Sequence, residues 1–249
     1  MDRTRARNAS YIIGFIHVKI LNRAPHRWKA ALGHVPHVLS SLFAIRIFRK
    51  PIEVMRCYLM RTCPESLCLE TRSGYKVHLT GDPDDVVTAV VVMGRADYGA
   101  VPEHGVIIDI GAHLGTFMLY AISKEVGEVY CYEPDPVLYD ALLRNVTDNA
   151  LSGKVKTFQA AVVGRSVGEV VFYQEGNASG HIGFRGGDSE GIRVPARTLS
   201  EVIADSGLRR VDLLKMDCEG SEYEIVSDTP AETWMRVRSV RLDEQAQNP

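Results

Sequence analysis

The chain has 249 residues, of which 45% are hydrophobic and 24% are charged, and its formal net charge is −2. These values are ordinary for a soluble protein whose chain is long enough to bury a sizeable core. The five cysteines include no Cys-x-x-Cys pair and form no zinc-like cluster, which argues against an oxidising compartment. We therefore expect a cytoplasmic protein with no bound metal.

The first part of the chain is strongly basic. Residues 1–63 contain twelve Lys and Arg but only Asp2 and Glu53, a net charge of +10 that leaves −12 for the remainder. Apolar residues at helical spacing, interleaved with arginines, predict helices over about residues 10–60. We therefore divide the chain into a basic helical N-terminal extension, residues 1–65, and a second domain, residues 66–249.

Several interpretations of the basic extension stay open. It can pack on the second domain, or it can contact an anionic substrate, a carrier or a membrane surface. Its apolar runs are shorter than the roughly 18–20 residues that a membrane span needs. We expect no nucleic acid as a partner, because the rest of the chain is acidic.

The predicted elements of the second domain alternate between strands and helices. A hairpin over residues 67–71 and 75–80 comes first, and a helix over about 84–93 follows it. Strands are then predicted at 105–110, 128–133, 155–162, 211–217 and 239–244, with helices at 116–124, 136–149, 200–205 and 222–228. An antiparallel-looking insert, 169–173 and 192–197, separates the third strand from the fourth. This alternation predicts an α/β fold with a doubly wound, Rossmann-like parallel sheet.

A glycine-bearing turn follows the first of these strands. Residues 106–115 read Val-Ile-Ile-Asp-Ile-Gly-Ala-His-Leu-Gly, which predicts a buried strand, a tight turn and the start of a helix. Free backbone N–H groups and the helix dipole at such a turn favour a nucleotide-like ligand. Asp109 directly precedes the turn, which suggests a cofactor with a positive end, such as the amino group of S-adenosylmethionine. We expect Gly111 to supply a positive φ or a close approach, and Gly115 to let the helix pack on the strand.

Two further acids follow the ends of predicted strands. Glu133 ends the second strand, 18 residues after Gly115, and is placed to accept both hydroxyls of a ribose. Asp217 ends the fourth strand, at the edge where open α/β sheets bind ligands. Beside it, we expect Lys215 to pair with a nearby carboxylate and Ser221 to cap the next helix.

These segments together resemble the FkbM family of S-adenosylmethionine-dependent methyltransferases. The match rests on residues 109–115, on Tyr132-Glu133-Pro134, and on the run Lys-Met-Asp-Cys-Glu-Gly-Ser-Glu at 215–222. The resemblance implies a class I methyltransferase fold over about residues 70–245, with S-adenosylmethionine as cofactor. It also implies O-methylation of a hydroxyl on a sugar, polyketide or other secondary metabolite. The predicted cofactor site comprises Asp109, Gly111, Ala112, His113, Gly115, Glu133, Ala161 and Asp217.

The chain departs from the family pattern in two places. Ser200 stands where the family's Thr-Leu-Asp segment has an acid, and the chain ends soon after the fifth strand, without two further antiparallel strands. These last edge strands are either missing or built otherwise. An uncovered sheet edge invites pairing with another chain, so a homodimer is a further hypothesis.

The candidates for the catalytic base lie in the insert and at the sheet edge. Residues 174–187 contain five glycines and can cover the site, and His181 among them has a side chain suited to proton transfer near neutral pH. Asp217 is the alternative base, although it can instead bind the cofactor, the acceptor or a divalent metal. Two other functions stay open: a nicotinamide-dependent oxidoreductase, and a non-catalytic scaffold or binding module on a vestigial fold.

Overall fold

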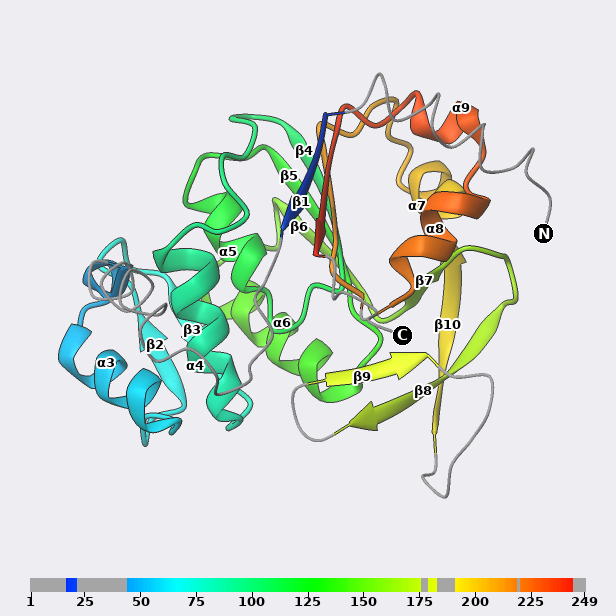
Figure 1. Cartoon of the computed structure of the whole chain (residues 1–249). Helices are drawn as coiled ribbons and strands as arrows, with labels where there is room; N and C mark the ends of the chain where they lie inside the picture. Colours follow the sequence, from blue (N-terminus) through cyan, green and yellow to red (C-terminus); the bar gives the residue numbers. More distant parts are fainter. Residues whose placement is uncertain (1–16, 22–43, 176–178, 183–190, 219, 244–249) are drawn as a thin grey trace.

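The computed structural model describes residues 17–21, 44–175, 179–182, 191–218 and 220–243. A central sheet lies between two groups of helices, and a smaller sheet lies beside it (Figure 1). This layered arrangement puts the carboxyl ends of the central strands at one edge, where the predicted site falls.

The central sheet has six strands in the order β1-β12-β11-β4-β5-β6, and every neighbouring pair is parallel. Its strands are β1 (His17–Leu21), β4 (Val106–Ile110), β5 (Glu128–Tyr132), β6 (Val155–Phe158), β11 (Leu213–Met216) and β12 (Ser239–Asp243). The central strands β4 and β11 are almost wholly buried, as parallel strands are when helices cover both faces of a sheet. The predicted doubly wound α/β fold is confirmed, and the five predicted strands supply all of the sheet except β1.

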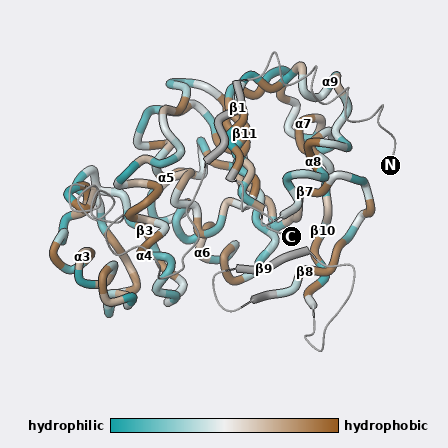
Figure 2. The backbone as a smooth tube through the Cα atoms, viewed as in Figure 1, coloured by the Kyte–Doolittle hydropathy of each residue, from teal (hydrophilic) through white to brown (hydrophobic). Residues whose placement is uncertain are grey.

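Side chains alternate between the two faces of the sheet, so each face builds its own apolar core. Ile107 and Val129 join a cluster with helices α4 (Pro83–Ala89), η2 (Val90–Gly94), α5 (Thr116–Ile122) and α6 (Pro136–Asp148). Ile108 and Tyr130, one residue further along the same strands, join a cluster with α7 (Leu199–Asp205), α8 (Glu222–Asp228) and α9 (Ala231–Trp234). Figure 2 shows the hydrophobic residues along these central strands. The two cores are what the strand-helix alternation requires.

The smaller sheet corresponds to the predicted insert. Its strands run in the order β7-β10-β8-β9, from β7 (Ala161–Val163), β8 (Glu169–Glu175), β9 (Ser179–Ile182) and β10 (Ile192–Thr198). The pair β8–β10 is antiparallel, as expected. Strand β8 also pairs antiparallel with β9, a strand that the sequence did not predict, whereas β7 and β10 are parallel. The third predicted strand, residues 155–162, was wrong as a single element. The chain leaves the central sheet after β6 and begins the smaller sheet at β7, with a backbone hydrogen bond from Ala160 N to Phe158 O at the corner.

The N-terminal extension is only partly helical in the described residues. It contains η1 (Ile45–Ile47) and α3 (Pro51–Met60), and the predicted hairpin follows as β2 (Cys68–Glu70) and β3 (Lys76–His78). Residues 17–21 were predicted to be helical, but they form β1, a strand parallel to β12. The first four of these residues, His-Val-Lys-Ile, alternate between polar and apolar, which also suits a strand.

Strand β1 changes the expectation for the edge of the sheet. The homodimer hypothesis assumed that the outer edge of β12, the fifth predicted strand, is uncovered. In the structure β1, from the N-terminal part of the chain, pairs with that edge.

Among the helices that the structure describes, none has the length and apolar character needed to cross a bilayer.

Candidate functional site

Three acidic residues lie at the carboxyl ends of adjacent central strands. Asp109 is in β4, Glu133 follows β5 and Asp217 follows β11, and β4 pairs with both of the other strands. Because the three strands are parallel, these ends share one edge of the sheet, which we call the acidic edge. The structure thus brings together the three acids that the sequence singled out.

The turn after β4 uses left-handed backbone conformations at alternate positions. Gly111 has a φ of 70° and Gly115 a φ of 89°, and His113 between them adopts a φ of 54°. A Cβ on Gly111 would lie 1.9 Å from the backbone oxygen of Asp217, which no side chain can tolerate. A Cβ on Gly115 would lie 2.7 Å from Leu142 Cδ1 in α6. The expected role of Gly111 is confirmed. The Cβ of a residue at position 115 would meet α6 and not the strand, so the packing of the helix on the strand through Gly115 stays a prediction. His113 takes the left-handed conformation that a third glycine would otherwise supply.

The backbone N–H groups of this turn are largely used within the protein. Gly111 N and Ala112 N both donate to the carbonyl oxygen of Tyr132 at 3.0 Å. His113 N donates to Glu133 Oε2 at 2.7 Å. The expectation of free N–H groups is therefore wrong for these three residues, because the end of β5 already accepts their hydrogen bonds.

Asp109 forms a buried ion pair with Lys215. Asp109 is fully buried, and its Oδ1 lies 3.0 Å from Lys215 Nζ on the neighbouring strand. The same ammonium group donates to the carbonyl oxygen of Gly111 at 2.5 Å and lies 3.8 Å from Asp217 Oδ2. Burial raises the pKa of Asp109, and the ammonium group opposes that rise. The predicted pairing of Lys215 with a carboxylate is confirmed.

Lys215 stays charged in spite of its burial. Burial lowers the pKa of Lys215, but Asp109, Tyr98 and Asp217 outweigh it and raise that pKa above its ordinary value. The Lys215 ammonium also lies 5.6 Å from the centre of the Tyr98 ring. One cation therefore lies beside two acidic side chains, and the formal charge of Lys215, Asp109 and Asp217 together is −1.

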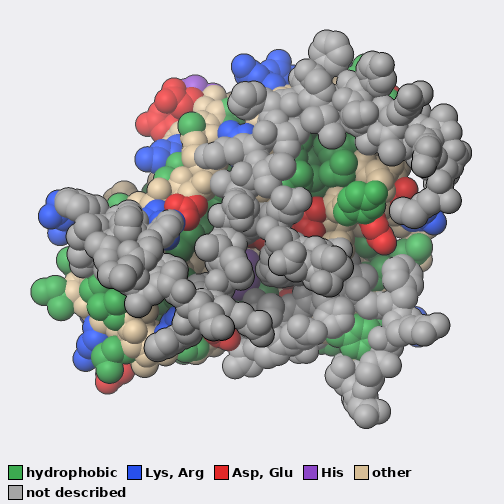
Figure 3. Space-filling model, viewed as in Figure 1, with side chains coloured by type: hydrophobic (Ala, Val, Ile, Leu, Met, Phe, Trp, Pro, Cys, Tyr) green, Lys and Arg blue, Asp and Glu red, His purple; other side chains and the backbone are tan. Residues whose placement is uncertain are grey.

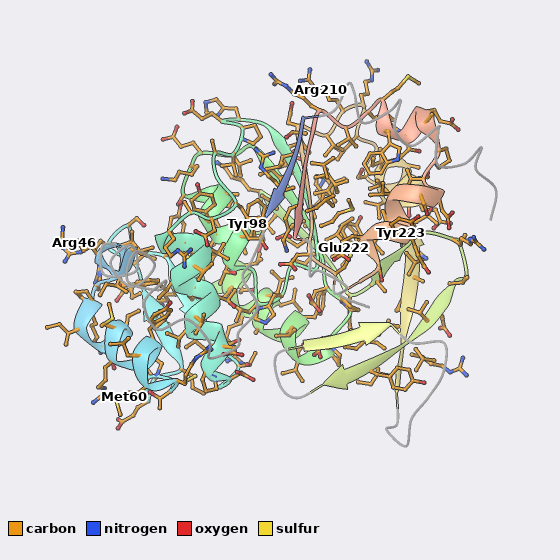
Figure 4. The ribbon with its side chains drawn as sticks, viewed as in Figure 1. Arg46, Met60, Tyr98, Arg210, Glu222 and Tyr223 are labelled. Atoms are coloured by element: carbon orange, nitrogen blue, oxygen red, sulfur yellow. The ribbon has the colours of Figure 1, made fainter. Side chains whose placement is uncertain are left out.

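Tyr98 holds Asp217 in place. Its hydroxyl donates to Asp217 Oδ2 at 2.6 Å, and its own backbone oxygen accepts a hydrogen bond from Arg241 Nε at 3.2 Å. The Asp217 side chain is 18% exposed, whereas the Asp109 side chain is fully buried. Asp217 is thus the accessible acid of the Asp109–Lys215–Asp217 group. Tyr98, which lies beside the central strands in Figure 4, belongs to no motif, and the sequence offered no signal for it.

Glu133 joins the turn after β4 to the start of α6. Its Oε2 accepts the N–H of His113, and its Oε1 accepts the N–H of Asp135 at 2.9 Å. Asp135 in turn caps α6 by accepting from Val137 N at 2.7 Å and Leu138 N at 3.2 Å. Burial raises the pKa of Glu133 to about 7, against the two backbone hydrogen bonds that lower it.

A fourth acid lies behind the turn. Asp85 in α4 is fully buried, and its Oδ2 accepts hydrogen bonds from the backbone N–H and the hydroxyl of Thr80, both at 2.7 Å. Its Oδ1 lies 3.9 Å from His113 Nε2. Burial raises the pKa of Asp85, and His113 opposes the rise. The sequence missed this residue, because Asp82-Pro-Asp-Asp predicts only the start of a helix.

Glu222 belongs to the turn that follows β11. Its two carboxylate oxygens accept the N–H groups of Cys218 at 2.6 Å and Gly220 at 2.8 Å, so it closes the turn after β11. Ser221 makes no capping hydrogen bond through its side chain, and the predicted cap is wrong. Figure 4 shows Glu222 at the start of α8, on the side of the sheet opposite α5.

Two predicted site residues lie in the smaller sheet. Ala161 is in β7, opposite Ala196 of β10, and is buried in the apolar cluster of that sheet. His181 is in β9, opposite Tyr173 of β8, and its side chain is outside the described part of the chain. Within the described residues, no group of three or more His, Cys, Asp or Glu side chains is arranged to hold a metal ion.

The parallel sheet, the glycine turn and the acidic edge define a Rossmann-like methyltransferase fold of class I. A family model described as "Methyltransferase FkbM domain" matches residues 109–240, just over half of the chain. The chain belongs to this FkbM methyltransferase family, as its motifs had suggested.

Two similar proteins are named as methyltransferases, and one of them carries the name FkbM. The chain is 32% identical over 180 residues to methyltransferase sdnD of Sordaria araneosa, a match that covers 59% of this chain and 69% of that protein. It is 30% identical over 166 residues to the 31-O-demethyl-FK506 methyltransferase FkbM of Streptomyces tacrolimicus, covering 54% of this chain and 63% of the relative. Among solved structures, a methyltransferase from Geobacter sulfurreducens aligns with a TM-score of 0.30 and 13% identity, over 94% of this chain and 73% of that one.

Proposed function

We propose that this chain transfers a methyl group from S-adenosylmethionine to a hydroxyl oxygen of a small acceptor, such as a sugar, a polyketide or another secondary metabolite. Membership of the FkbM family supports methyl transfer. The relative from Streptomyces tacrolimicus is named for an oxygen as the methylated atom, which supports O-methylation here.

The observation that carries the proposal is the position of Glu133. Its carboxylate lies at the carboxyl end of β5 and accepts one N–H from each of two turns. An ionised carboxylate has about four lone-pair sites, so roughly two are left for the two hydroxyls of a ribose. An acid at the end of the second strand is the ribose acceptor of dinucleotide folds, and the same chemistry suits the ribose of S-adenosylmethionine.

The charge of the acidic edge also fits this cofactor. Asp109 and Asp217 share the cation of Lys215, so the formal charge of the group beside the glycine turn is −1. A cofactor with a cationic end is attracted to such a group, whereas the pyrophosphate of a nicotinamide dinucleotide is repelled. The turn from Gly111 to Gly115 and the acids Glu133 and Asp217 would hold the cofactor.

The chain's own residues then have to orient the acceptor and remove its proton. When bound, S-adenosylmethionine supplies an electrophilic methyl group to an oxygen held in line with it. The hydroxyl proton of the acceptor passes to a base, for which Asp217 and His181 are the candidates. Asp217 is held by the Tyr98 hydroxyl and is partly exposed, which suits either proton transfer or binding. His181 lies on the smaller sheet, whose β8–β9 pair can limit the access of water.

A ligand-binding experiment tests the proposal. We expect S-adenosylmethionine and S-adenosylhomocysteine to raise the melting temperature, because a ligand at about 100 times its Kd adds about 2.7 kcal/mol of stability. Glu133→Ala should weaken both in calorimetry, and Glu128→Ala, at the exposed start of the same strand, should not. A shift with NADH alone would favour an oxidoreductase, and no shift with any of the three would favour a scaffold. Transfer of a labelled methyl group to an extract then identifies the acceptor class.

A further inference from the structure

Helix α3 is apolar on two opposite faces. One face packs in the core through Val54 and Cys57. Three large apolar side chains lie on the opposite face: Ile52, Leu59 and Met60, with exposed fractions of 86%, 61% and 66%. Their spacing of seven and eight residues puts them on one side of the helix. A helix that covers a core normally presents a polar face to water, so this second apolar face is unusual.

Basic side chains surround the exposed face of α3. Arg46, Arg49 and Lys50 precede the helix, Arg56 lies within its exposed face, and Arg61 follows it. Figure 3 shows Lys and Arg side chains among hydrophobic ones at this end of the molecule, and in Figure 4 Arg46 and Met60 project away from the ribbon there.

The ion pairs in this region are on the surface. Arg49 pairs with Glu70, Lys50 with Glu53, and Arg61 with Asp84, and the side chains of all three cations are substantially exposed. Exposed pairs contribute little and exchange readily, so these cations can turn to another anion. An open hollow of about 580 Å³ lies at the start of the helix. It is lined by Arg49, Lys50, Pro51, Ile52, Glu53 and Arg56.

We propose that α3 docks this chain on the surface of an anionic phospholipid bilayer. In that position Ile52, Leu59 and Met60 enter the boundary between headgroups and acyl chains, while the long basic side chains reach back to the phosphates. The hollow at the start of α3 receives a headgroup phosphate between Arg49, Lys50 and Arg56. The proposal goes beyond methyl transfer and does not depend on it.

Two other occupants fit the exposed face of α3 less well. A second copy related by a two-fold axis would bring Arg56 and its basic neighbours against their own equivalents, which is repulsive. A stable protein partner needs about 800 Å² and some 20–30 residues on each side, far more than one ten-residue helix face offers. A bilayer needs no matching shape, so it is the occupant that a small, basic and apolar face fits.

Vesicle sedimentation of the full chain tests the proposal. We expect it to sediment with phosphatidylcholine vesicles that contain about 30% phosphatidylserine, and weakly with phosphatidylcholine alone. Ile52→Glu combined with Met60→Glu, and separately Arg56→Glu, should each raise the lipid concentration for half-binding about tenfold or more. Met235→Glu and Arg238→Glu are matched controls, because both residues are exposed near α9, away from α3 (Figure 1).

All the substituted side chains are exposed, so the variants should keep the melting temperature of the parent chain. A parent chain that does not sediment with the anionic vesicles would overturn the proposal. So would binding that the α3 variants and the controls reduce equally, because other basic residues would then be responsible. A dimer in light scattering that the α3 variants dissolve, without any vesicle binding, would assign the face to a second copy instead.

Discussion

Replacing Lys215 by methionine removes the single cation that two acids share, and its cost can be worked out from the structure. Lys215 Nζ lies 3.0 Å from Asp109 Oδ1, and both side chains are buried. At an effective dielectric constant of about 20, two unit charges at that distance attract by about 5 kcal/mol. Without the ammonium group, Asp109 is left charged and buried with no cation beside it. We expect Lys215→Met to lower the free energy of unfolding by about 3–5 kcal/mol.

The double variant Asp109→Asn with Lys215→Met separates pairing from packing. When both charges are gone, neither has to be desolvated, and the double variant should recover about 2–3 kcal/mol relative to Lys215→Met alone. The measurement is a urea unfolding curve, followed by circular dichroism, for the parent, the two single variants and the double variant. An unchanged m value makes the midpoints comparable.

An exposed ion pair of similar length is the control. Arg165 Nε lies 2.8 Å from Asp228 Oδ2, but the Arg165 side chain is largely in solvent. Arg165→Met should therefore leave the midpoint almost unchanged. Our account of the buried pair would be refuted if Lys215→Met unfolded at the same urea concentration as Arg165→Met. It would also be refuted if the two single effects simply added in the double variant. If Lys215→Met could not be folded but the double variant could, this result would support our account of the buried pair.

Three further predictions concern the turn, Glu133 and the base. Gly111→Ala should lower the free energy of unfolding by at least about 2 kcal/mol in thermal unfolding, because the φ of Gly111 is 70° and the new Cβ would meet a backbone oxygen. Gly153→Ala is the control and should have no such effect, because its Cβ would have no atom within 4 Å. Glu133 has its pKa raised from 4.5 to about 7, so its contribution to stability is present below pH 4.5 and is lost as pH rises through 7. Because of Glu133, the parent chain should be about 2 kcal/mol more stable toward unfolding at pH 5 than at pH 8, and Glu133→Gln should remove this difference. Identical profiles of stability against pH for the parent and the variant would contradict this. His181→Ala should keep its calorimetric affinity for S-adenosylmethionine and slow turnover about 10²-fold or more; an unchanged kcat would leave Asp217 as the base.

The sequence predicted the parts of the fold that local pattern controls. Strands and helices of the second domain follow from their apolar periods and from the turns between them. The meeting of Asp109, Glu133 and Asp217 follows as well, because parallel strands in a doubly wound sheet end at the same edge. Gly111 was predictable because only glycine tolerates both its φ and the approach of a backbone oxygen.

Other features depend on packing between distant segments, which no local pattern encodes. Residues 17–21 become a strand because β12, over 200 residues later, offers them an open edge. Tyr98 and Asp85 reach the site because the segments around α4 and η2 pack beside the turn after β4. Each is a single polar residue without a spacing rule, so only the folded chain shows its partners.

The spacing of Lys215 and Asp217 explains why the two acids nearest the glycine turn have different tasks. Lys215 lies opposite Asp109 in the register of β11 and β4, and residues two apart on a strand point to the same face. A Lys-x-Asp pair at the end of β11 therefore puts the ammonium group beside Asp109 and a carboxylate one step beyond it, outside the strand. Asp109 has a structural task. It holds Lys215 in place, and Lys215 in turn holds the carbonyl oxygen of Gly111. Under the function that we propose, a cationic ligand would then meet Asp217, the accessible member of the group.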